Sequence, residues 1–207
     1  MEIKVKIDNH KGGQLINLFK KFGIEFTVER DGSSEFVDLG LPSGLKWATC
    51  NVGAKTPTEY GKYFRWGEIT DAREMGSAET YDYNKPFEDA ATYHMGGAWR
   101  MPTTEEFQEL YANTTSKWIK NYQGYGVSGR LFTSKVNGNE LFFPAAGYCG
   151  NGSALNVGTG GYVWSSSLYA SYPYYAYYLN FLSSNVYPQG TQHLGRYFGR
   201  SVRGVRV

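Results

Sequence analysis

The stretch AYYLNF, residues 176–181, decides the fold expected for this chain, because its side chains alternate in the way that predicts a β-strand. Tyr177, Leu179 and Phe181 fall on one face, and Tyr178 and Asn180 fall on the other. If a core lies beneath the strand, the first set is the buried one. The pattern therefore predicts a sheet with one buried face and one face that presents Tyr178 and Asn180 to solvent.

Tyrosine is concentrated around this strand, with six tyrosines within YASYPYYAYYLNF, residues 169–181. The next segment, SSNVYPQGTQHLGRYFG, residues 183–199, has a similar composition. A tyrosine ring buries a large area at a low rotamer cost and keeps a hydroxyl for hydrogen bonding, and Ser, Gly and Asn add adaptable polar contacts. The two segments predict a ligand-binding surface, and the alternative is a tyrosine-rich sheet that packs only on its own neighbours. The candidate binding residues are Tyr169, Tyr172, Tyr174, Tyr175, Tyr178, Asn180, Asn185, Tyr187, Gln192, His193, Tyr197 and Phe198.

The composition narrows the class of protein. The chain has 207 residues, of which 41% are hydrophobic and 17% aromatic, so it can bury a core. Its formal net charge of +2 gives little attraction to phosphate backbones, and nucleic acid is not an expected partner. No apolar run is long enough to span a membrane, and the start MEIKVKIDNH does not resemble a signal peptide. We expect a protein that is cytoplasmic at synthesis and does not insert into membranes.

Residues 1–34 predict a small β-α-β module. Residues 3–7 (IKVKI) and 24–29 (IEFTVE) alternate as half-buried strands, and the segment between them carries leucines and phenylalanines at helical spacing. A module of this size seldom folds alone. We therefore expect it to dock on the main domain or to self-associate, which would make the protein a homo-oligomer.

From residue 35 onward the sequence predicts a second domain, of the α+β class, built from short apolar runs separated by Gly, Pro and Asn. Its one convincing helix begins after Pro102, where Thr103 and Glu106 have the spacing of a capping box. Phe107, Leu110 and Tyr111 are its expected buried stripe. The tryptophans expected to anchor the irregular backbone are Trp47, Trp66, Trp99, Trp118 and Trp164.

Six blocks in this order carry a resemblance to a known family: VDLGLPSGLKWATCNVGA, EYGKYFRWGE, WRMPTTEEFQEL, FFPAAGY, WSSSL and GRSVRGVRV. They resemble the paralogous domain that is abundant in Bacteroidetes and Fibrobacter proteins, which is similar to the C-type lectin fold in the branch of the formylglycine-generating enzymes. The resemblance covers residues 35–207. It implies a C-type lectin-like ligand-binding domain behind the β-α-β module.

The C-terminal block also resembles the variable proteins of diversity-generating retroelements, in which asparagine codons drift to Tyr, Ser, Gly, His and Asp. This resemblance implies a non-enzymatic protein that binds a protein or glycan ligand on a target cell or surface, and that is assembled on a phage particle or a cell surface. Two alternatives remain: a fixed-sequence adhesin or structural module of the same fold, and an enzyme related to the formylglycine-generating enzymes.

Several motifs of the related families are missing from the sequence. The E-P-N, Q-P-D and W-N-D elements that support calcium-dependent sugar binding do not occur, and no cysteine follows residue 149 to supply the reactive pair of the formylglycine-generating enzymes. His10, His94 and His193 do not have metal-ligand spacing. We therefore expect no catalytic residue, no metal site and no cofactor.

Three smaller expectations concern individual side chains. Cys50 and Cys149 fit two buried thiols better than a disulfide, although pairing stays open. The serines of WSSSL are expected to bond the backbone of an irregular loop. Of the C-terminal arginines, at least one is expected to pair with a carboxylate such as Glu68 or Asp71. These arginines are Arg196, Arg200, Arg203 and Arg206.

Overall fold

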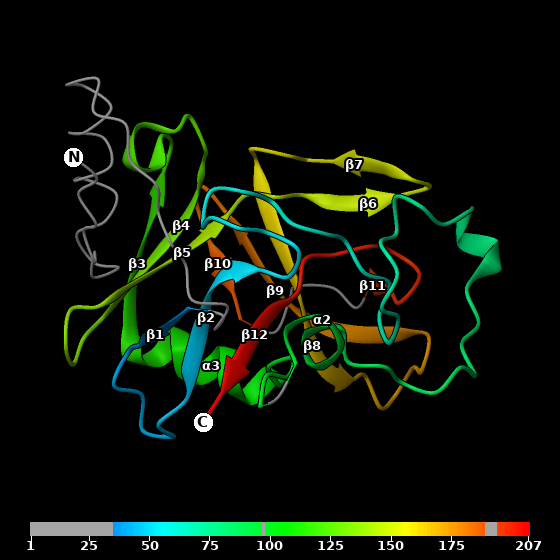
Figure 1. The fold of residues 1–207 in the computed structure, drawn as a ribbon, viewed down its shortest axis with the longest axis horizontal. Helices are drawn as coiled ribbons and strands as arrows, with labels where there is room; N and C mark the ends of the chain where they lie inside the picture. Colours follow the sequence, from blue (N-terminus) through cyan, green and yellow to red (C-terminus); the bar gives the residue numbers. More distant parts are fainter. Residues whose placement is uncertain (1–34, 97, 189–193) are drawn as a thin grey trace, which may run out of the picture.

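The structure, a computed structural model, describes residues 35–96, 98–188 and 194–207 (Figure 1). The β-α-β module expected over residues 1–34 lies outside the described residues. The described strands are β1 (Phe36–Asp38), β2 (Lys46–Asn51), β3 (Thr114–Ile119), β4 (Gly129–Ser134), β5 (Glu140–Pro144), β6 (Tyr148–Gly150), β7 (Ser153–Leu155), β8 (Gly160–Leu168), β9 (Tyr175–Leu182), β10 (Val186–Tyr187), β11 (Leu194–Gly195) and β12 (Arg203–Arg206). The helices are α2 (Ala90–Met95) and α3 (Thr104–Asn113), and short 3-10 turns occur at η1 (Ala78–Thr80) and η2 (Tyr122–Gly124).

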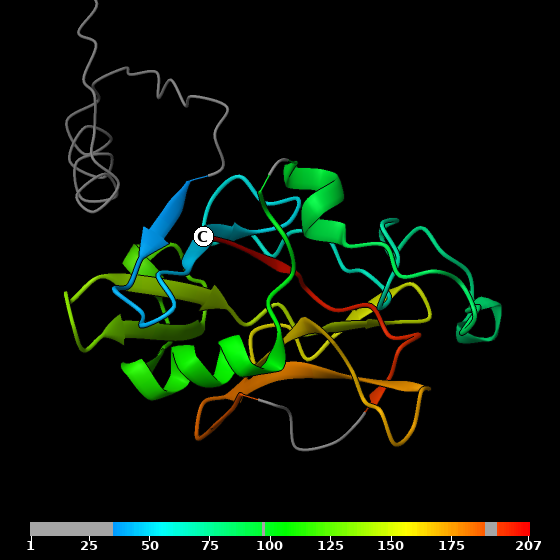
Figure 2. The ribbon, with the colours of Figure 1, turned by 90° about the horizontal axis from the view of Figure 1, so that it is seen from below.

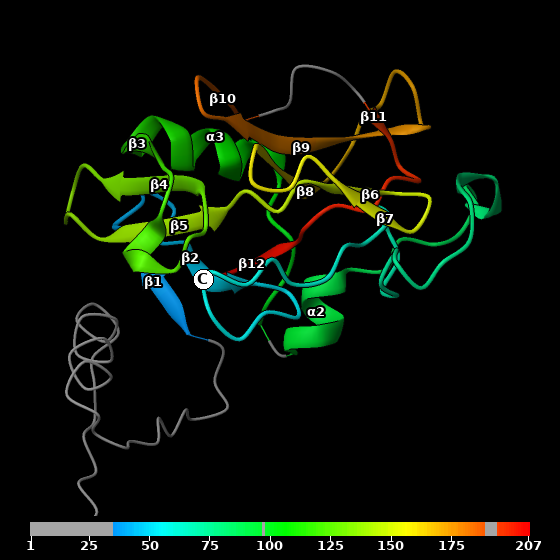
Figure 3. The ribbon, with the colours of Figure 1, turned by 90° about the horizontal axis from the view of Figure 1, so that it is seen from above.

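The strands form small antiparallel sheets, so the α+β class is confirmed. One sheet has the order β1-β2-β12 and another has the order β3-β4-β5, while β6 and β7 form a hairpin. In the remaining sheet β8 pairs with one edge of β9. The other edge of β9 pairs with β10 near one end and with β11 near the other end, as Figure 3 shows.

The β8 and β9 strands lie between two hydrophobic clusters and contribute residues to both of them. Val163, Leu179 and Phe181 belong to one cluster, whereas Trp164 and Tyr178 belong to the other. The first cluster also contains residues of α3, which runs alongside β9 in Figure 2. The second contains residues of α2 and of the segment before β12. Both faces of β9 are therefore buried.

This burial corrects the expectation for residues 176–181. Tyr178 is only 2% exposed and Asn180 only 7% exposed, so neither presents its side chain to solvent as predicted. Tyr177, expected in the core, is half-buried. Alternation identifies which residues share a face, but it does not reveal a second layer that covers the outer face. Here that layer comes from segments distant in sequence, which pack on Trp164 and Tyr178.

The capping box at the start of α3 is confirmed. The Thr103 hydroxyl accepts a hydrogen bond from the Glu106 amide, and the Glu106 carboxylate accepts one from the Thr103 amide. Phe107 and Leu110 are fully buried as expected, but Tyr111 is 45% exposed, which corrects that part of the stripe. The five tryptophans pack as expected: four are buried, and Trp118 packs half-buried against the first cluster.

The C-terminal arginines do not use carboxylates as expected. Within the described residues none of the four forms an ion pair; Asp71 pairs with Arg73, and Oε2 of Glu68 has no hydrogen-bond partner. Buried Arg203 instead donates to the carbonyls of Ala48 and Thr49 at 2.9 and 2.8 Å. Main-chain carbonyls thus replace the anion, because their dipoles satisfy the guanidinium donors inside the core.

Arg200 is fully buried against aromatic rings. Its guanidinium carbon lies 3.8 Å from the ring centroid of Tyr178 and 4.4 Å from that of Trp164, a cation–π arrangement. Burial lowers the pKa of Arg200 to about 10. Asn180 Oδ1 and Ser201 Oγ are also buried, and neither has a hydrogen-bond partner in the described part of the chain. Tyr178 therefore belongs to the interior packing of the sheet.

The remaining side-chain expectations are met in part. Neither cysteine forms a disulfide; Cys149 is buried and Cys50 is half-buried. Ser165 and Ser166 donate to the carbonyls of Tyr177 and Pro102 as predicted, but they lie within strand β8 and not in an irregular loop. No helix in the described part of the chain is long and apolar enough to cross a membrane.

Candidate ligand-binding face

The turn between β8 and β9 presents two of the predicted binding residues to solvent. Tyr172 is 57% exposed and Tyr174 is 58% exposed, whereas Tyr169 and Tyr175 are half-buried. The backbone of the turn is held by its own hydrogen bonds, from the Tyr172 amide to the Tyr169 carbonyl and from the Tyr175 amide to the Tyr172 carbonyl. The exposed rings thus project from a backbone that is already paired.

The rings of this turn contact one another. Tyr169 and Tyr172 are stacked with their centroids 6.0 Å apart, and Tyr172 meets Tyr175 edge-on at 6.3 Å. Tyr169 also meets Tyr177 edge-on at 5.3 Å. Such offset and edge-on pairs are the arrangements that aromatic rings prefer, and they restrict the freedom of each ring. The turn therefore offers a partly ordered aromatic surface.

A second segment, residues 81–84, lies beside this turn and was not identified from the sequence. The Tyr83 ring lies 4.8 Å from the Tyr174 ring, and the Tyr81 ring lies 4.8 Å from the Tyr83 ring, both edge-on. Burial raises the pKa of Tyr81 to about 12, and burial also raises the pKa of Tyr83. The Tyr81 hydroxyl donates to the Trp66 carbonyl, which anchors this segment to the core.

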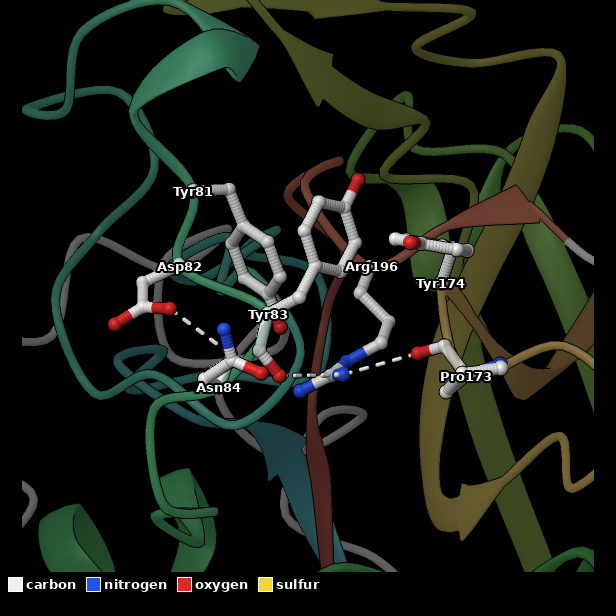
Figure 4. A pocket seen from close by; sticks show the side chains of 7 residues that line it. All are labelled: Tyr81, Asp82, Tyr83, Asn84, Pro173, Tyr174 and Arg196. Carbon is white, nitrogen blue, oxygen red and sulfur yellow. Dashed lines mark hydrogen bonds between the residues drawn. The ribbon is translucent and has the colours of Figure 1, made fainter.

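Arg196 connects residues 81–84 to the β8–β9 turn. It is 5% exposed, and its Nη1 donates to the carbonyls of Tyr83 and Pro173 at 3.2 and 3.0 Å (Figure 4). Its guanidinium carbon lies 4.6 Å from the Trp66 ring centroid and 5.4 Å from that of Tyr81. No carboxylate in the described part of the chain pairs with it. Arg196 is thus a buried cation that fixes two loops together.

A pocket of about 380 Å³ opens where the two segments meet. Figure 4 shows Asp82 and Asn84 on one side of it and Pro173 and Tyr174 on the other, with Arg196 between them. Asp82 Oδ1 accepts a hydrogen bond from the main-chain amide of Asn84 at 2.9 Å, which orders the carboxylate. The residues that line the pocket are Tyr81, Asp82, Tyr83, Asn84, Pro173, Tyr174 and Arg196. Only Tyr174 of these was among the predicted binding residues.

The structure brings some of the predicted binding residues together. Tyr197 follows strand β11, where Gly195 pairs with Tyr175, so Tyr197 lies near the aromatic turn. The rings of Tyr197 and Phe198 lie 4.4 Å apart, and Phe198 in turn contacts Tyr148 at 5.6 Å. Tyr197 and Phe198, both half-buried, therefore adjoin the group formed by the turn. We call the surface formed by Tyr83, Tyr169, Tyr172, Tyr174, Tyr175 and Tyr197 the tyrosine face.

Other predicted binding residues lie elsewhere. Asn185 and Tyr187 are at the far end of β9, where Tyr187 pairs with Asn180, and the Asn185 amide donates to the Tyr187 hydroxyl at 3.0 Å. Asn180 and Tyr178 are buried, which removes them from any surface site. Gln192 and His193 lie outside the described residues. The predicted binding residues that remain at the surface therefore lie near opposite ends of β9.

No group of three or more His, Cys, Asp or Glu side chains that could hold a metal ion occurs among the described residues. His94 contacts the Ile69 carbonyl at 2.8 Å, and burial raises the pKa of the Cys149 thiol. The functional groups of the tyrosine face are aromatic rings and phenol hydroxyls, which suit recognition of a ligand.

Comparisons with protein-family models, with curated proteins and with solved structures found no match to this chain.

Proposed function

We propose that the protein is a non-enzymatic ligand-binding protein that recognises a protein or glycan on a target cell or surface through the tyrosine face. The observation that carries the proposal is the pair of exposed rings at the β8–β9 turn, with Tyr172 and Tyr174 each more than half exposed. Exposed aromatic patches on soluble proteins commonly serve binding. Tyrosine rings at the centre of an interface can each contribute about 2 kcal/mol to binding.

The sequence resemblance supports the same proposal. A C-type lectin-like scaffold of the formylglycine-generating-enzyme branch would carry the tyrosine face, and a diversity-generating retroelement would vary it. Such variation requires that surface residues change while the core keeps its packing. Tyr172 and Tyr174 meet this requirement, because their side chains are exposed and the turn backbone pairs with itself. Fixed-sequence adhesion by the same face is the runner-up.

Binding measurements with surface variants test the proposal. The fluorescently labelled full chain is applied to panels of bacterial cells, purified surface proteins and printed glycans. We expect Tyr172→Ser/Tyr174→Ser to lose at least about tenfold in affinity for any target bound by the wild type, because two anchors are removed. Tyr125→Ser is the control, since Tyr125 is 44% exposed and lies before β4, outside the tyrosine face. Equal binding by the double variant and the wild type would contradict the proposal.

Population sequencing separates the diversified form of the proposal from the fixed one. The 3′ end of the gene and the flanking DNA are sequenced across one population. We expect substitutions at the codons of exposed tyrosines such as Tyr172 and Tyr174, with a near-identical repeat that differs at adenines, while Leu179 and Phe181 stay constant. Invariant codons without a repeat would favour the fixed-sequence adhesin.

A further inference from the structure

We propose that the pocket between residues 81–84 and the β8–β9 turn binds a neutral saccharide ring. This inference rests on the proposed ligand-binding function and names the class of ligand at one part of the tyrosine face. The pocket has a volume of about 380 Å³, within the range of roughly 300–1,000 Å³ that is common for small-molecule sites. Its walls come from segments about ninety residues apart that Arg196 holds together, so the cavity is formed by the fold.

The charges around the pocket favour a neutral ligand. Arg196 supplies a buried positive charge, and Asp82 supplies a negative charge on an exposed side chain. The two formal charges are opposite, so an anionic or a cationic group would be attracted by one of them and repelled by the other. The Arg196 charge already lies over the rings of Trp66 and Tyr81, so these rings are not open to a ligand cation. A lining with one positive and one negative group has no net formal charge, which favours a neutral ligand over an ion.

The polar groups of the pocket match hydroxyls. The Asp82 carboxylate only accepts hydrogen bonds, whereas the side-chain amide of Asn84 and the hydroxyl of Tyr174 both donate and accept. Asp82 Oδ1 accepts a hydrogen bond from the main-chain amide of Asn84, and a carboxylate has about four acceptor positions, so capacity for a ligand remains. Sugar hydroxyls donate and accept in the same manner. Two adjacent hydroxyls on one sugar ring can therefore bond the Asp82 carboxylate and the Asn84 side-chain amide at the same time.

The aromatic walls suit the apolar side of a sugar ring. Tyr174 is 58% exposed. Tyr83 meets it edge-on and does not stack on it (Figure 4). A pyranose has a face of C–H groups that packs on such a ring, and its hydroxyls lie around the rim. Tyr174 would thus supply the apolar contact while Asp82 and Asn84 supply the hydrogen bonds.

The test is a printed array of neutral, acidic and amino saccharides, probed with the labelled full chain, followed by titration of the strongest neutral binder. We expect binding to neutral saccharides. We also expect Asp82→Ala, Asn84→Ala and Tyr174→Ala each to lower the affinity about tenfold, and Tyr174→Phe to lower it less, because the ring is kept. The matched control Tyr125→Ala should bind like the wild type, and unfolding curves should confirm that every variant is folded.

Other outcomes would overturn the inference and identify the part that fails. Binding of acidic saccharides only, or of amino sugars only, would overturn the neutral class. Neutral binding that survives all three alanine variants would place the sugar elsewhere. No saccharide binding, together with binding of a protein target that Tyr172→Ser weakens, would overturn the pocket assignment and leave the proposed function standing. Tyr172 serves for this purpose because it belongs to the tyrosine face but does not line the pocket.

Discussion

Tyr174 and Tyr178 lie four residues apart in a tyrosine-rich segment, yet one is 58% exposed and the other 2% exposed. Tyr174 stands in the turn before β9 and contacts Tyr83 across the mouth of a pocket. Tyr178 stands inside β9 and packs on Trp164 and Arg200. The same residue type thus stabilises the core in one place and is offered to solvent in the other.

The difference teaches that the environment, and not the composition, assigns the role of each tyrosine. A phenol packs well in a core when its hydroxyl finds a polar neighbour, and it binds well on a surface when its ring stays exposed. Tyr178 lies where β9 is covered by the second hydrophobic cluster, so this ring loses access to solvent. Tyr172 and Tyr174 stand in the turn outside this cluster, and more than half of each residue is exposed.

Replacing Tyr178 should have the largest effect on stability. We expect Tyr178→Ala to lower the free energy of unfolding by about 3–5 kcal/mol, because a buried ring is removed and Arg200 loses its nearest aromatic partner. Urea unfolding at neutral pH measures this. Tyr178→Phe keeps the ring and should cost only about 1 kcal/mol. A loss below about 1 kcal/mol for the alanine variant would show that the outer face of β9 is not core.

Lowering the pH should lower the free energy of unfolding, because the start of α3 depends on the Glu106 carboxylate. Burial alone would raise the pKa of Glu106, but hydrogen bonds from Arg100 and from the Thr103 amide outweigh it and hold the pKa below its usual range. The folded-state pKa is therefore below the unfolded one. The stabilisation is present above the ordinary glutamate pKa and is lost as the pH falls through the folded-state value.

The variant Glu106→Gln measures this contribution. At neutral pH we expect it to lower the free energy of unfolding by about 1 kcal/mol, because the capping box and the ion pair are weakened. We also expect the difference from the wild type to shrink as the pH falls below the usual glutamate range. A difference that stays constant from neutral to acidic pH would contradict the role assigned to the carboxylate. Circular dichroism during urea unfolding gives both values.

Changing the exposed tyrosines should have the smallest effect on stability. We expect Tyr172→Ser/Tyr174→Ser to change the free energy of unfolding by no more than about 0.5 kcal/mol, since both side chains are largely in water. The same urea experiment measures it beside Tyr178→Ala. A loss comparable to that of the core variant would place the two rings in the packing and remove the contrast with Tyr178.

Local features of the fold could be predicted from the sequence. The capping box of α3 depends on residues three apart, Thr103 and Glu106, and it occurs as predicted. The face shared by Leu179 and Phe181 follows from strand alternation and is also confirmed. Both patterns depend on residues within a short segment, so the local sequence is enough to predict them.

The burial of Tyr178 and Asn180 could not be predicted in this way. The hydrophobic cluster that contains Tyr178 also includes Phe64 and Val202, which are distant in sequence. The arginines illustrate the same limit: Arg203 bonds to carbonyls about 150 residues away, where a carboxylate was expected. Alternation and charge counting contain no information on such partners.

The candidate site was predicted only in part for a similar reason. The exposed tyrosines of the turn could be identified because they gather within a short segment. Tyr83 could not, because it reaches the turn through Arg196, which lies 113 residues further along the chain. Asn185 and Tyr187 were included because they are near in sequence, but the antiparallel pairing of β10 places them at the far end of β9.

The most direct test of the division between core and surface is a single-position scan of residues 169–187, with each variant sorted once for resistance to protease and once for binding to a target of the wild type. We predict that most substitutions at Tyr178, Leu179 and Phe181 fail the protease sort. Substitutions at Tyr172 and Tyr174 should pass it and fail the binding sort. Full binding by the variants at Tyr172 and Tyr174, or their loss in the protease sort, would contradict the assignment of these tyrosines to a binding face.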